Sequence, residues 1–357
     1  MGPLNTLRVV ELAAGAPTAY AATLLADLGA DVVRIDRPAP GGRHHAADPL
    51  GRGRRSLAAD LKNEDDLRTV RSLIDRADVF LEGLRPGMCE RLGLGPDALT
   101  ASNPRLIYAR LSGWGRSGPW AMRPGHDLSF LAMAGLLDGD RPADAPPAPP
   151  STYLSTFAGG GMFQALGILA ALHVRGRSGR GQVVDAAMVD GAAMLDVMVR
   201  QWRDLPGMTT VTDAPFYTTY VCQDGLSVAV GAIEPRFYDT LLECLALDPA
   251  SLPDRADEST WPALRARLAE AFAEHPRHHW TKVFDEHEAC VVPVLDAAEA
   301  PGHPALHERG TFVEVAGSHQ PAPSPRFSRT PAGTPAPAPA PGEHTTEVLD
   351  AWQAPTG

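Results

Sequence analysis

Residues 7–36 read LRVVELAAGAPTAYAATLLADLGADVVRID, and this stretch decides the fold. Its two ends, residues 7–12 and 31–36, are apolar runs rich in branched side chains, which is typical of buried strands. Between them a Gly/Ala-rich turn leads into an amphipathic segment that ends near Leu28. The stretch therefore predicts a strand, a helix and a second strand, which is a β-α-β unit.

The same alternation continues along the first 200 residues. A helical pattern over residues 64–76 is followed by strand patterns at 79–81 and 106–111. Strands that alternate with helices form a parallel sheet, because each helix carries the chain back across a sheet face. We therefore expect a Rossmann-like, doubly wound α/β domain.

Two proline-rich segments interrupt this pattern. The segment RPADAPPAPP at 141–150 is expected on the surface, because proline lacks the amide donor that a helix or a central strand needs. The run PAGTPAPAPAP at 331–341 predicts an extended connector before a short terminal helix. From Tyr217 onward, short strands and helices indicate a second, smaller α+β domain. The expected division is a large domain of residues 1–200 and 318–357, with linkers and the small domain at 201–317.

Composition indicates a globular protein and excludes several classes. The chain has 357 residues, of which 44% are hydrophobic and 21% charged, enough for a sizeable core. No run approaches the roughly 18 apolar residues that a membrane-spanning helix needs, and Glu11 interrupts the N-terminus where a signal peptide would be unbroken. The net charge of −11 argues against nucleic acid as a partner. We therefore expect a cytoplasmic protein that binds a phosphorylated small molecule, and no nucleic acid or membrane.

Motifs for three common chemistries are missing. The turn AAGAPTA at 13–19 lacks the G-x-G-x-x-G spacing of dinucleotide sites, so Asp36 is interpreted as an ordinary acid at a strand end. The segment GWGRSGP at 113–119 has the wrong spacing for a G-x-S-x-G nucleophile. The cysteines form no C-x-x-C pair, and the paired histidines lack the spacing of zinc ligands. We expect no metal and no permanently bound cofactor.

The segment EGLRPGMCER at 82–91 carries two arginines on either side of a Pro-Gly turn. Arg85 and Arg91 could both reach one anion, because the planar guanidinium group donates paired hydrogen bonds to phosphate. The alternative is that both are solvated surface charges. The residues alone leave these two interpretations open.

A histidine and a run of glycines are the strongest candidates for catalysis. His126 lies in GHDLSFLAMAG (125–135), at the start of an apolar helical pattern, and histidine exchanges protons near neutral pH. The run AGGGMF at 158–163 is expected at the N-terminus of a helix over about 162–174, where free amides favour a developing negative charge such as an enolate oxygen. The alternative is a structural histidine beside a tightly packed glycine turn, and it stays open.

A series of motifs runs in order along nearly the whole chain: LRVVELA (7–13), LLADLGADVVRIDRP (24–38), DLK (60–62), LIYARLSGWG (106–115), GHD (125–127), GILAAL (167–172), GRGQVVDAAMVDG (179–191), VAVGAIEPRFY (228–238) and PRFSRT (325–330). This series resembles the α-methylacyl-CoA racemases of the family III CoA-transferase (CaiB/BaiF) superfamily. The resemblance implies an acyl-CoA thioester substrate. It also implies an interlocked homodimer, in which the small domain of one chain closes the active site of the other.

The resemblance further implies the residues of the binding site. Coenzyme A, as part of the substrate, is expected in contact with Arg37, Ala59, Leu61, Lys62, Gly83, Arg85, Arg91 and Gly125. The acyl group and the enolate oxygen are expected near Gly159, Gly160, Phe130, Met188, Asp190 and Tyr217. Phe130 stands where the racemases have tyrosine, and the region between Trp202 and Tyr217 is shorter than theirs, so we expect a different acyl group from the usual branched fatty chain.

The resemblance assigns the chemistry to four residues. His126 matches the histidine that removes the Cα proton, and Glu234 matches a carboxylate that shares or tunes that proton. Thr156 stands where the racemases have their second acid/base group, an aspartate that is the nucleophile of the CoA-transferases. Covalent CoA transfer is therefore excluded unless Asp127 takes over that role.

Three functions follow from these residues. The first is an isomerase of acyl-CoA thioesters that works through an enolate. The second keeps the enolate but ends in β-elimination or cyclisation, on CoA or on a carrier-bound thioester. The third is a protein that binds CoA thioesters without catalysis. Retention of His126 and Glu234 favours catalysis over binding alone, and the first function is our primary hypothesis.

Overall fold

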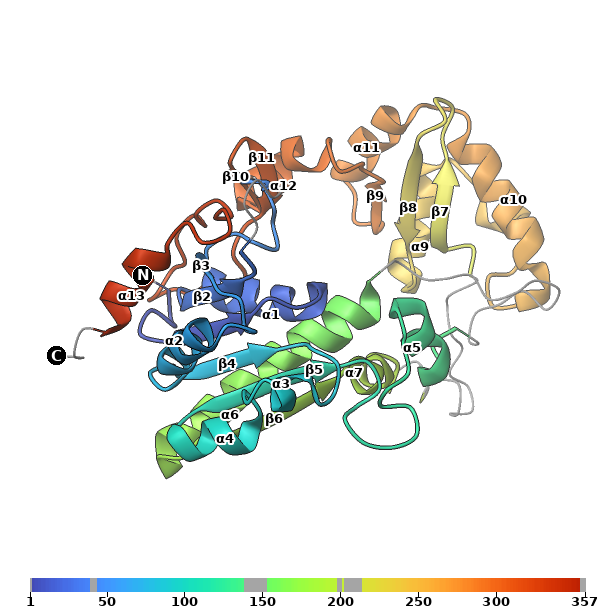
Figure 1. Ribbon diagram of the computed structural model, residues 1–357. Helices are drawn as coiled ribbons and strands as arrows, with labels where there is room; N and C mark the ends of the chain where they lie inside the picture. The colour runs from blue at the N-terminus through green and yellow to red at the C-terminus, as the bar shows by residue number, and fades with distance from the viewer. Residues whose placement is uncertain (1, 39–43, 138–152, 198–200, 202–213, 354–357) are drawn as a thin grey trace. The chain divides into compact units, whose positions relative to one another are not determined.

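The chain forms two compact units, which are described separately. The computed structural model describes residues 2–38, 44–137, 153–197, 201 and 214–353 (Figure 1). The first unit comprises residues 1–197 and 307–357, and the second comprises residues 198–306. The second unit thus ends at Leu306 rather than at residue 317. The proline-rich segment 141–150 and most of the region between Trp202 and Tyr217 lie outside the described residues.

A six-stranded parallel sheet forms the centre of the first unit. Its strand order is β3-β2-β1-β4-β5-β6, the doubly wound order in which the direction of chain progression reverses between β1 and β4. The β-α-β unit predicted from residues 7–36 is confirmed, with β1 pairing in parallel with β2. The elements are β1 Arg8–Leu12, α1 Ala16–Asp27, β2 Asp31–Asp36, β3 Arg55–Ala58, α2 Glu64–Ile74, β4 Val79–Glu82, α3 Met88–Arg91, α4 Pro96–Ser102, β5 Ile107–Ser112, α5 Asp127–Ala134, α6 Phe163–Ser178, β6 Gln182–Ala187 and α7 Met188–Leu195.

Helices cover both faces of this sheet, and each face has its own apolar core. One core joins side chains of β1 and β2 to Leu25 of α1 and Ile168 of α6. The other joins the opposite face to Leu73 of α2 and to Trp352 of the terminal helix. The central strands β4 and β5 are mostly apolar because both of their faces are buried, although β4 ends in Glu82 and β5 contains Arg110.

The last part of the chain returns to the first unit. Strands β10 (Phe312–Val315) and β11 (Ser318–Pro321) form an antiparallel hairpin, and helix α13 (Thr345–Gln353) packs on the sheet. The Trp352 indole donates a hydrogen bond to Asp31 of β2 at 2.8 Å. Arg52 donates both to Asp27 and to Gln320 of the hairpin, so a buried polar network ties the returning segment to α1.

The glycine run does not begin a helix, and that expectation is wrong. A π-helical segment, η1 (Leu154–Met162), leads directly into α6, so residues 159–161 lie inside a continuous helix whose amides are used by helical hydrogen bonds. These glycines permit close packing instead. A Cβ at Gly159 would lie 2.8 Å from the Ala192 amide nitrogen of α7, and a Cβ at Gly161 would lie 2.6 Å from the Pro17 carbonyl oxygen of α1.

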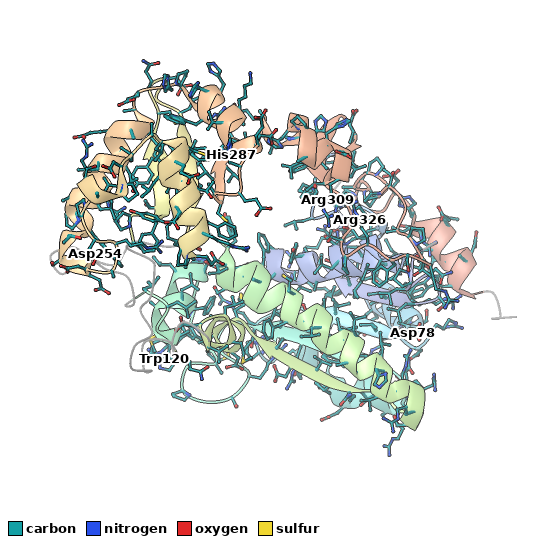
Figure 2. The ribbon with its side chains drawn as sticks, turned by 180° about the vertical axis from the view of Figure 1, so that it is seen from behind. Asp78, Trp120, Asp254, His287, Arg309 and Arg326 are labelled. Atoms are coloured by element: carbon teal, nitrogen blue, oxygen red, sulfur yellow. The ribbon has the colours of Figure 1, made fainter. Side chains whose placement is uncertain are left out.

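The same helix corrects a second expectation. The helical stretch Leu154–Ser178 has 25 residues and is long and apolar enough to cross a membrane by length and composition. The expectation failed because glycine, serine and threonine residues interrupt its large apolar side chains, although the mean hydropathy of the stretch is high. Ile168 and Ala171 are buried against the sheet. Arg175 of this helix pairs with Asp78, which is labelled in Figure 2, and the other carboxylate oxygen of Asp78 accepts from the Arg8 amide.

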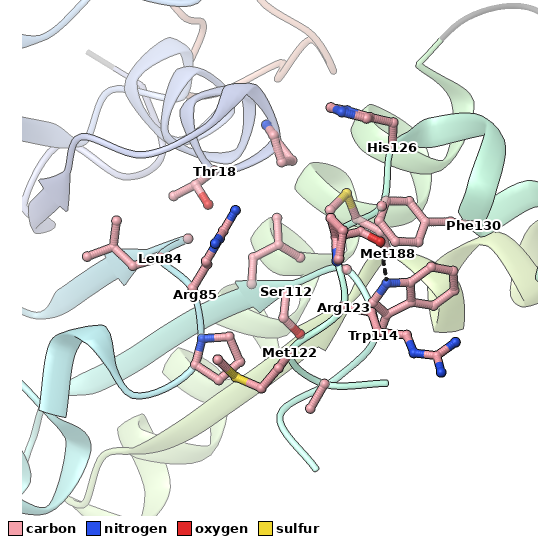
Figure 3. A pocket seen from close by; sticks show the side chains of 18 residues that line it. Thr18, Leu84, Arg85, Ser112, Trp114, Met122, Arg123, His126, Phe130 and Met188 are labelled. Carbon is pink, nitrogen blue, oxygen red and sulfur yellow. Dashed lines mark hydrogen bonds between the residues drawn. The ribbon is translucent and has the colours of Figure 1, made fainter. Parts of the chain in front are cut away.

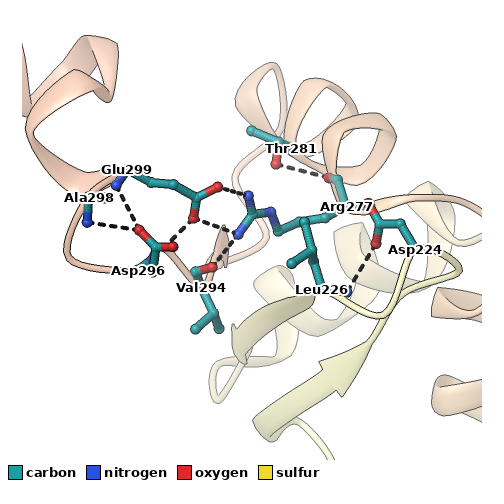
Figure 4. Close-up of polar contacts among 8 residues, drawn as sticks. All are labelled: Asp224, Leu226, Arg277, Thr281, Val294, Asp296, Ala298 and Glu299. Atoms are coloured by element: carbon teal, nitrogen blue, oxygen red, sulfur yellow. Dashed lines mark hydrogen bonds and ion pairs between the residues drawn. The ribbon is translucent and has the colours of Figure 1, made fainter.

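The second unit is a three-stranded antiparallel sheet covered by helices. The strand order is β7-β8-β9, and its core packs strand residues such as Tyr220 against Phe272 and Trp280. The Arg277 guanidinium donates to the Val294 carbonyl, directly after β9, and to Glu299 (Figure 4). The backbone amide of Arg277 donates to Asp224. The elements are β7 Tyr217–Val221, β8 Ser227–Gly231, α9 Pro235–Cys244, α10 Trp261–Phe272, α11 Arg277–Asp285, β9 Val291–Pro293 and α12 Pro304–Arg309, which leads back to the first unit.

Candidate active site

A cavity of about 290 Å³ opens at the carboxyl ends of β4 and β5, beside the first turn of α1 (Figure 3). This is next to the point where the strand order reverses, the usual binding position in a doubly wound sheet. Two loops, the end of strand β5 and three helices contribute to its wall. The lining residues are Pro17, Thr18, Gly83, Leu84, Arg85, Pro86, Leu111, Ser112, Gly113, Trp114, Ala121, Met122, Arg123, Pro124, Gly125, His126, Phe130 and Met188.

His126 lies at the rim of this cavity. It is the N-cap residue of α5, its side chain is exposed, and its backbone amide donates to the Ser129 hydroxyl at 3.4 Å. The preceding residue must be small, because a Cβ at Gly125 would lie 2.7 Å from the Phe130 ring. That ring packs edge-on against Trp114, with centroids 4.7 Å apart. The apolar cluster therefore fixes the backbone that carries the histidine.

Asp127 is engaged in structural hydrogen bonds. Its Oδ1 accepts from the Ser155 hydroxyl and from the Thr156 amide, each at 2.7 Å. Because these donors lie in the first turns of η1, the carboxylate caps that helix and ties it to α5. Thr156 itself is half-buried. Asp127 is therefore not a free carboxylate poised for nucleophilic attack.

A second cavity, of about 310 Å³, gathers four of the residues predicted for CoA. Arg37, Ala59, Leu61 and Lys62 line it together with Asp36 and Leu84. Leu84 also lines the first cavity, where Gly83, Arg85 and Gly125 lie. The predicted CoA residues thus divide between two neighbouring cavities on the same unit, with the cations of Arg37 and Lys62 in one and that of Arg85 in the other.

The remaining predicted residues do not line these two cavities. Arg91 is exposed and points its guanidinium at the Met88 sulfur, 2.6 Å away. Gly159 and Gly160 are buried in the helix contact described above, and Asp190 is exposed in the first turn of α7. Tyr217 of β7 and Glu234, the N-cap residue of α9, are exposed in the second unit.

An ion pair behind the first cavity was missed by the sequence analysis. Glu82 is fully buried at the end of β4, pairs with Arg116, and accepts from the Leu84 amide at 2.8 Å. Burial lowers the pKa of Arg116 from its ordinary value. The pair joins two loops that line the cavity, residues 83–86 and 113–126. Only the tertiary structure reveals it, because the partners are separated by two helices, a strand and their connections.

Two buried hydroxyl groups in the cavity were also missed. Among the residues that the structure describes, Thr18 Oγ1 and Ser112 Oγ have no hydrogen-bond partner. Both side chains are at least nine-tenths buried. The available signal was the position of Thr18 in the first turn after the first strand, where α/β proteins bind ligands. Within the same described residues, no group of three potential metal ligands occurs.

Comparison with known proteins gives consistent matches over most of the chain. The model of CoA-transferase family III matches residues 4–345. The chain is 43% identical to the α-methylacyl-CoA racemase of Mus musculus over 356 residues, covering 97% of this chain and 92% of that protein. It is also 43% identical to the Homo sapiens racemase, with the same coverage. A CaiB/BaiF family protein from Brucella suis shares the fold, with a TM-score of 0.85, 24% identity, and coverage of 99% of this chain and 100% of that one.

Proposed function

This chain belongs to CoA-transferase family III, and from that premise we propose that it is a racemase-type isomerase of acyl-CoA thioesters. The observation that carries the proposal is the exposed imidazole of His126 at the rim of a cavity on the switch-point side of the sheet. Curated relatives with 43% identity are α-methylacyl-CoA racemases, which supports the same class of substrate here.

The proposed chemistry begins with removal of the proton on the thioester Cα. His126 takes this proton, and the electron pair of the C–H bond moves into a C–C double bond as the carbonyl oxygen becomes an enolate oxygen. Return of a proton to Cα regenerates the thioester. Thr156 cannot supply that proton as a carboxylic acid would, so water or another group does so. Glu234 is proposed as the carboxylate that tunes the histidine.

The CoA part of the substrate is proposed to occupy the second cavity and the passage past Leu84. Arg37 and Lys62 there supply positive charge, which suits the phosphate groups of CoA. Arg85, in the first cavity, is exposed and makes no side-chain hydrogen bond or ion pair among the described residues. The acyl group would then lie toward Phe130 and Met188.

Covalent CoA transfer is a weaker candidate for this chain. That route needs a carboxylate nucleophile, and Thr156 stands at the position where the resemblance places it. The nearby Asp127 is held by two donors, so attack through this oxygen would break the cap of η1. A fate of the enolate other than racemisation, namely β-elimination, remains compatible with the same base.

We also propose that two chains form the active assembly, in the cytoplasm. Support comes from apolar side chains left exposed on the first unit. On α6, Leu166 and Val174 are 61% and 49% exposed, and Val183 on the edge strand β6 is 40% exposed. Such a surface is typical of one covered in an oligomer. Light scattering of the purified protein tests this, and a monomer would contradict it.

Hydrogen exchange at Cα tests the catalytic proposal. The protein is incubated with a 2-methylacyl-CoA in deuterium oxide, and deuterium in the recovered thioester is followed by mass spectrometry. We expect exchange that is lost in His126→Ala and kept in His319→Ala, a matched variant of an exposed histidine on the β10–β11 hairpin. Exchange that survives in His126→Ala would exclude this histidine as the base.

A second substrate separates the two fates of the enolate. With a 3-hydroxy-2-methylacyl-CoA, β-elimination releases water and leaves an α,β-unsaturated thioester, whereas racemisation leaves the mass unchanged in ordinary water. We expect no unsaturated product. If CoA binds but neither exchange nor elimination occurs, the protein binds thioesters without catalysis.

A further inference from the structure

Thr18 carries a buried hydroxyl group that no described residue satisfies. It lies in the first turn of α1, its side chain is fully buried, and its Oγ1 has no hydrogen-bond partner in the described parts of the chain. Burial of an unpaired hydroxyl costs stability, so such groups call for a physical explanation. Thr23, in the same helix, shows the ordinary arrangement: its hydroxyl donates to the Ala19 carbonyl at 2.9 Å.

Positive charge lies on the side of the cavity to which the Thr18 hydroxyl points. In Figure 3 the hydroxyl points to the side of the cavity where the Arg85 guanidinium extends. The α1 N-terminus adds partial positive charge: its N-cap residue, Gly15, offers no side-chain cap, and its first turn contains no acid. The nearest acid on the neighbouring strand, Glu82, is already paired with Arg116. Among the described residues, no acceptor bonds to the Thr18 hydroxyl.

The adjoining backbone is shaped to admit the hydroxyl. A Cβ on Gly83 would overlap Thr18 Oγ1, so a residue with a side chain there would displace the threonine. Gly83 also begins the loop that carries Arg85. The two donors are therefore brought to one wall of the cavity by the start of α1 and the end of β4.

We propose that Thr18 is a binding residue whose hydroxyl donates a hydrogen bond to an oxygen of the CoA part of the substrate, alongside Arg85. The acceptor is a phosphate oxygen or an amide carbonyl of the pantetheine arm, which offer the same acceptor chemistry. This inference rests on the proposed binding of CoA thioesters. It adds a residue to that site which the motif series did not indicate.

Direct binding tests the inference without relying on turnover. Calorimetry measures the affinities of CoA and of pantetheine, which lacks the phosphates, for the full chain and for Thr18→Val, Thr18→Ser and Thr23→Val. Because valine keeps the shape but cannot donate, we expect Thr18→Val to weaken CoA binding about three- to tenfold. Thr18→Ser restores the affinity, and Thr23→Val leaves it unchanged. Weakening with both ligands identifies the amide carbonyl, and weakening with CoA alone identifies a phosphate.

Two measurements distinguish a binding role of the Thr18 hydroxyl from a purely structural one. The free Thr18→Val protein is expected to unfold at the same or a higher denaturant midpoint, since the hydroxyl it removes has no partner. A lower midpoint would reveal an internal partner and overturn the inference. So would unchanged affinity for both ligands, or a fall in kcat with unchanged affinity for CoA. If the unaltered protein binds no CoA, it is the proposed function that fails.

Discussion

The carboxylate of Asp127 accepts a hydrogen bond from the backbone amide of Thr156, with 2.7 Å between Oδ1 and N. The same oxygen accepts from the Ser155 hydroxyl. The residue next to the proposed base thus holds the first turn of η1, the helical segment that contains Thr156. The start of α5, which carries His126, and the start of η1 are therefore joined through the Asp127 carboxylate.

This coupling predicts a stability effect at Asp127. Replacing it with alanine leaves the Thr156 amide and the Ser155 hydroxyl without their acceptor, so we expect Asp127→Ala to lower the free energy of unfolding by about 1–3 kcal/mol. Asp127→Asn keeps an acceptor oxygen and should lose less. Urea denaturation followed by circular dichroism measures both. Equal stability of Asp127→Ala and the unaltered protein would show that the contact is dispensable.

Introducing a carboxyl group at Thr156 predicts a gain of function. General acid/base groups contribute about 10²–10⁴-fold, so we expect Thr156→Asp to raise the rate of racemisation by at least about tenfold. The neighbouring Asp127 raises the pKa of the new carboxyl group by like-charge repulsion. Chiral analysis of the product measures the rate, and Thr156→Asn is the uncharged control. A gain in both variants would rule out proton transfer as its cause.

Gly191, at the contact between η1 and α7, and Gly176, in α6, predict opposite effects of a glycine-to-alanine substitution. A Cβ at Gly191 would overlap the Gly159 carbonyl, whereas a Cβ at Gly176, in α6, meets no atom within 4 Å. Gly191→Ala should therefore destabilise by about 1–3 kcal/mol. Gly176→Ala should stabilise by about 0.4–1 kcal/mol, because it reduces the freedom of the unfolded chain. Thermal unfolding of both variants checks this, and a destabilised Gly176→Ala would contradict it.

The ion pair between Glu82 and Arg116 predicts a loss of stability that an exposed pair does not share. Glu82→Gln leaves a buried guanidinium without its counter-charge, and we expect a cost of about 3 kcal/mol or more. The pair of Asp65 with Arg68 lies on the surface, so Asp65→Asn should cost less than about 1 kcal/mol. Denaturant unfolding compares the two. If both cost the same, the buried pair does not stabilise the cavity loops.

The buried thiol of Cys89 leads us to expect that the free energy of unfolding falls at alkaline pH. Burial raises the pKa of its thiol from 9.0 to about 11. Ionisation is thus easier in the unfolded chain, so this contribution is fully present below pH 9 and is lost as the pH rises toward 11. Burial also raises the pKa of Tyr108, which acts in the same direction. Unfolding experiments from pH 8 to 11 should show a decline, which Cys89→Ala makes shallower.

Much of the fold was predictable because local patterns and topology agree. The strands at 31–36 and 79–82 and the helix beginning at Glu64 match their predicted positions closely. Strand β3 (Arg55–Ala58) was missed because its four residues, RSLA, have no apolar periodicity of their own. It forms because its backbone pairs in parallel with the edge of β2. The glycine run was placed wrongly, since three glycines indicate both a helix start and a close helix contact.

The sequence by itself determined the family, the parallel order of strands and helices, and the position of His126 before α5, because these depend on local periodicity and on a motif series along the chain. Only the tertiary structure decided which polar groups are paired. It engaged Asp127 as a helix cap, buried Glu82 against Arg116, and left the Thr18 hydroxyl without a hydrogen-bond partner among the described residues. The physical reason is that hydrogen bonds and burial join residues distant in sequence, and spacing along the chain does not encode their distances.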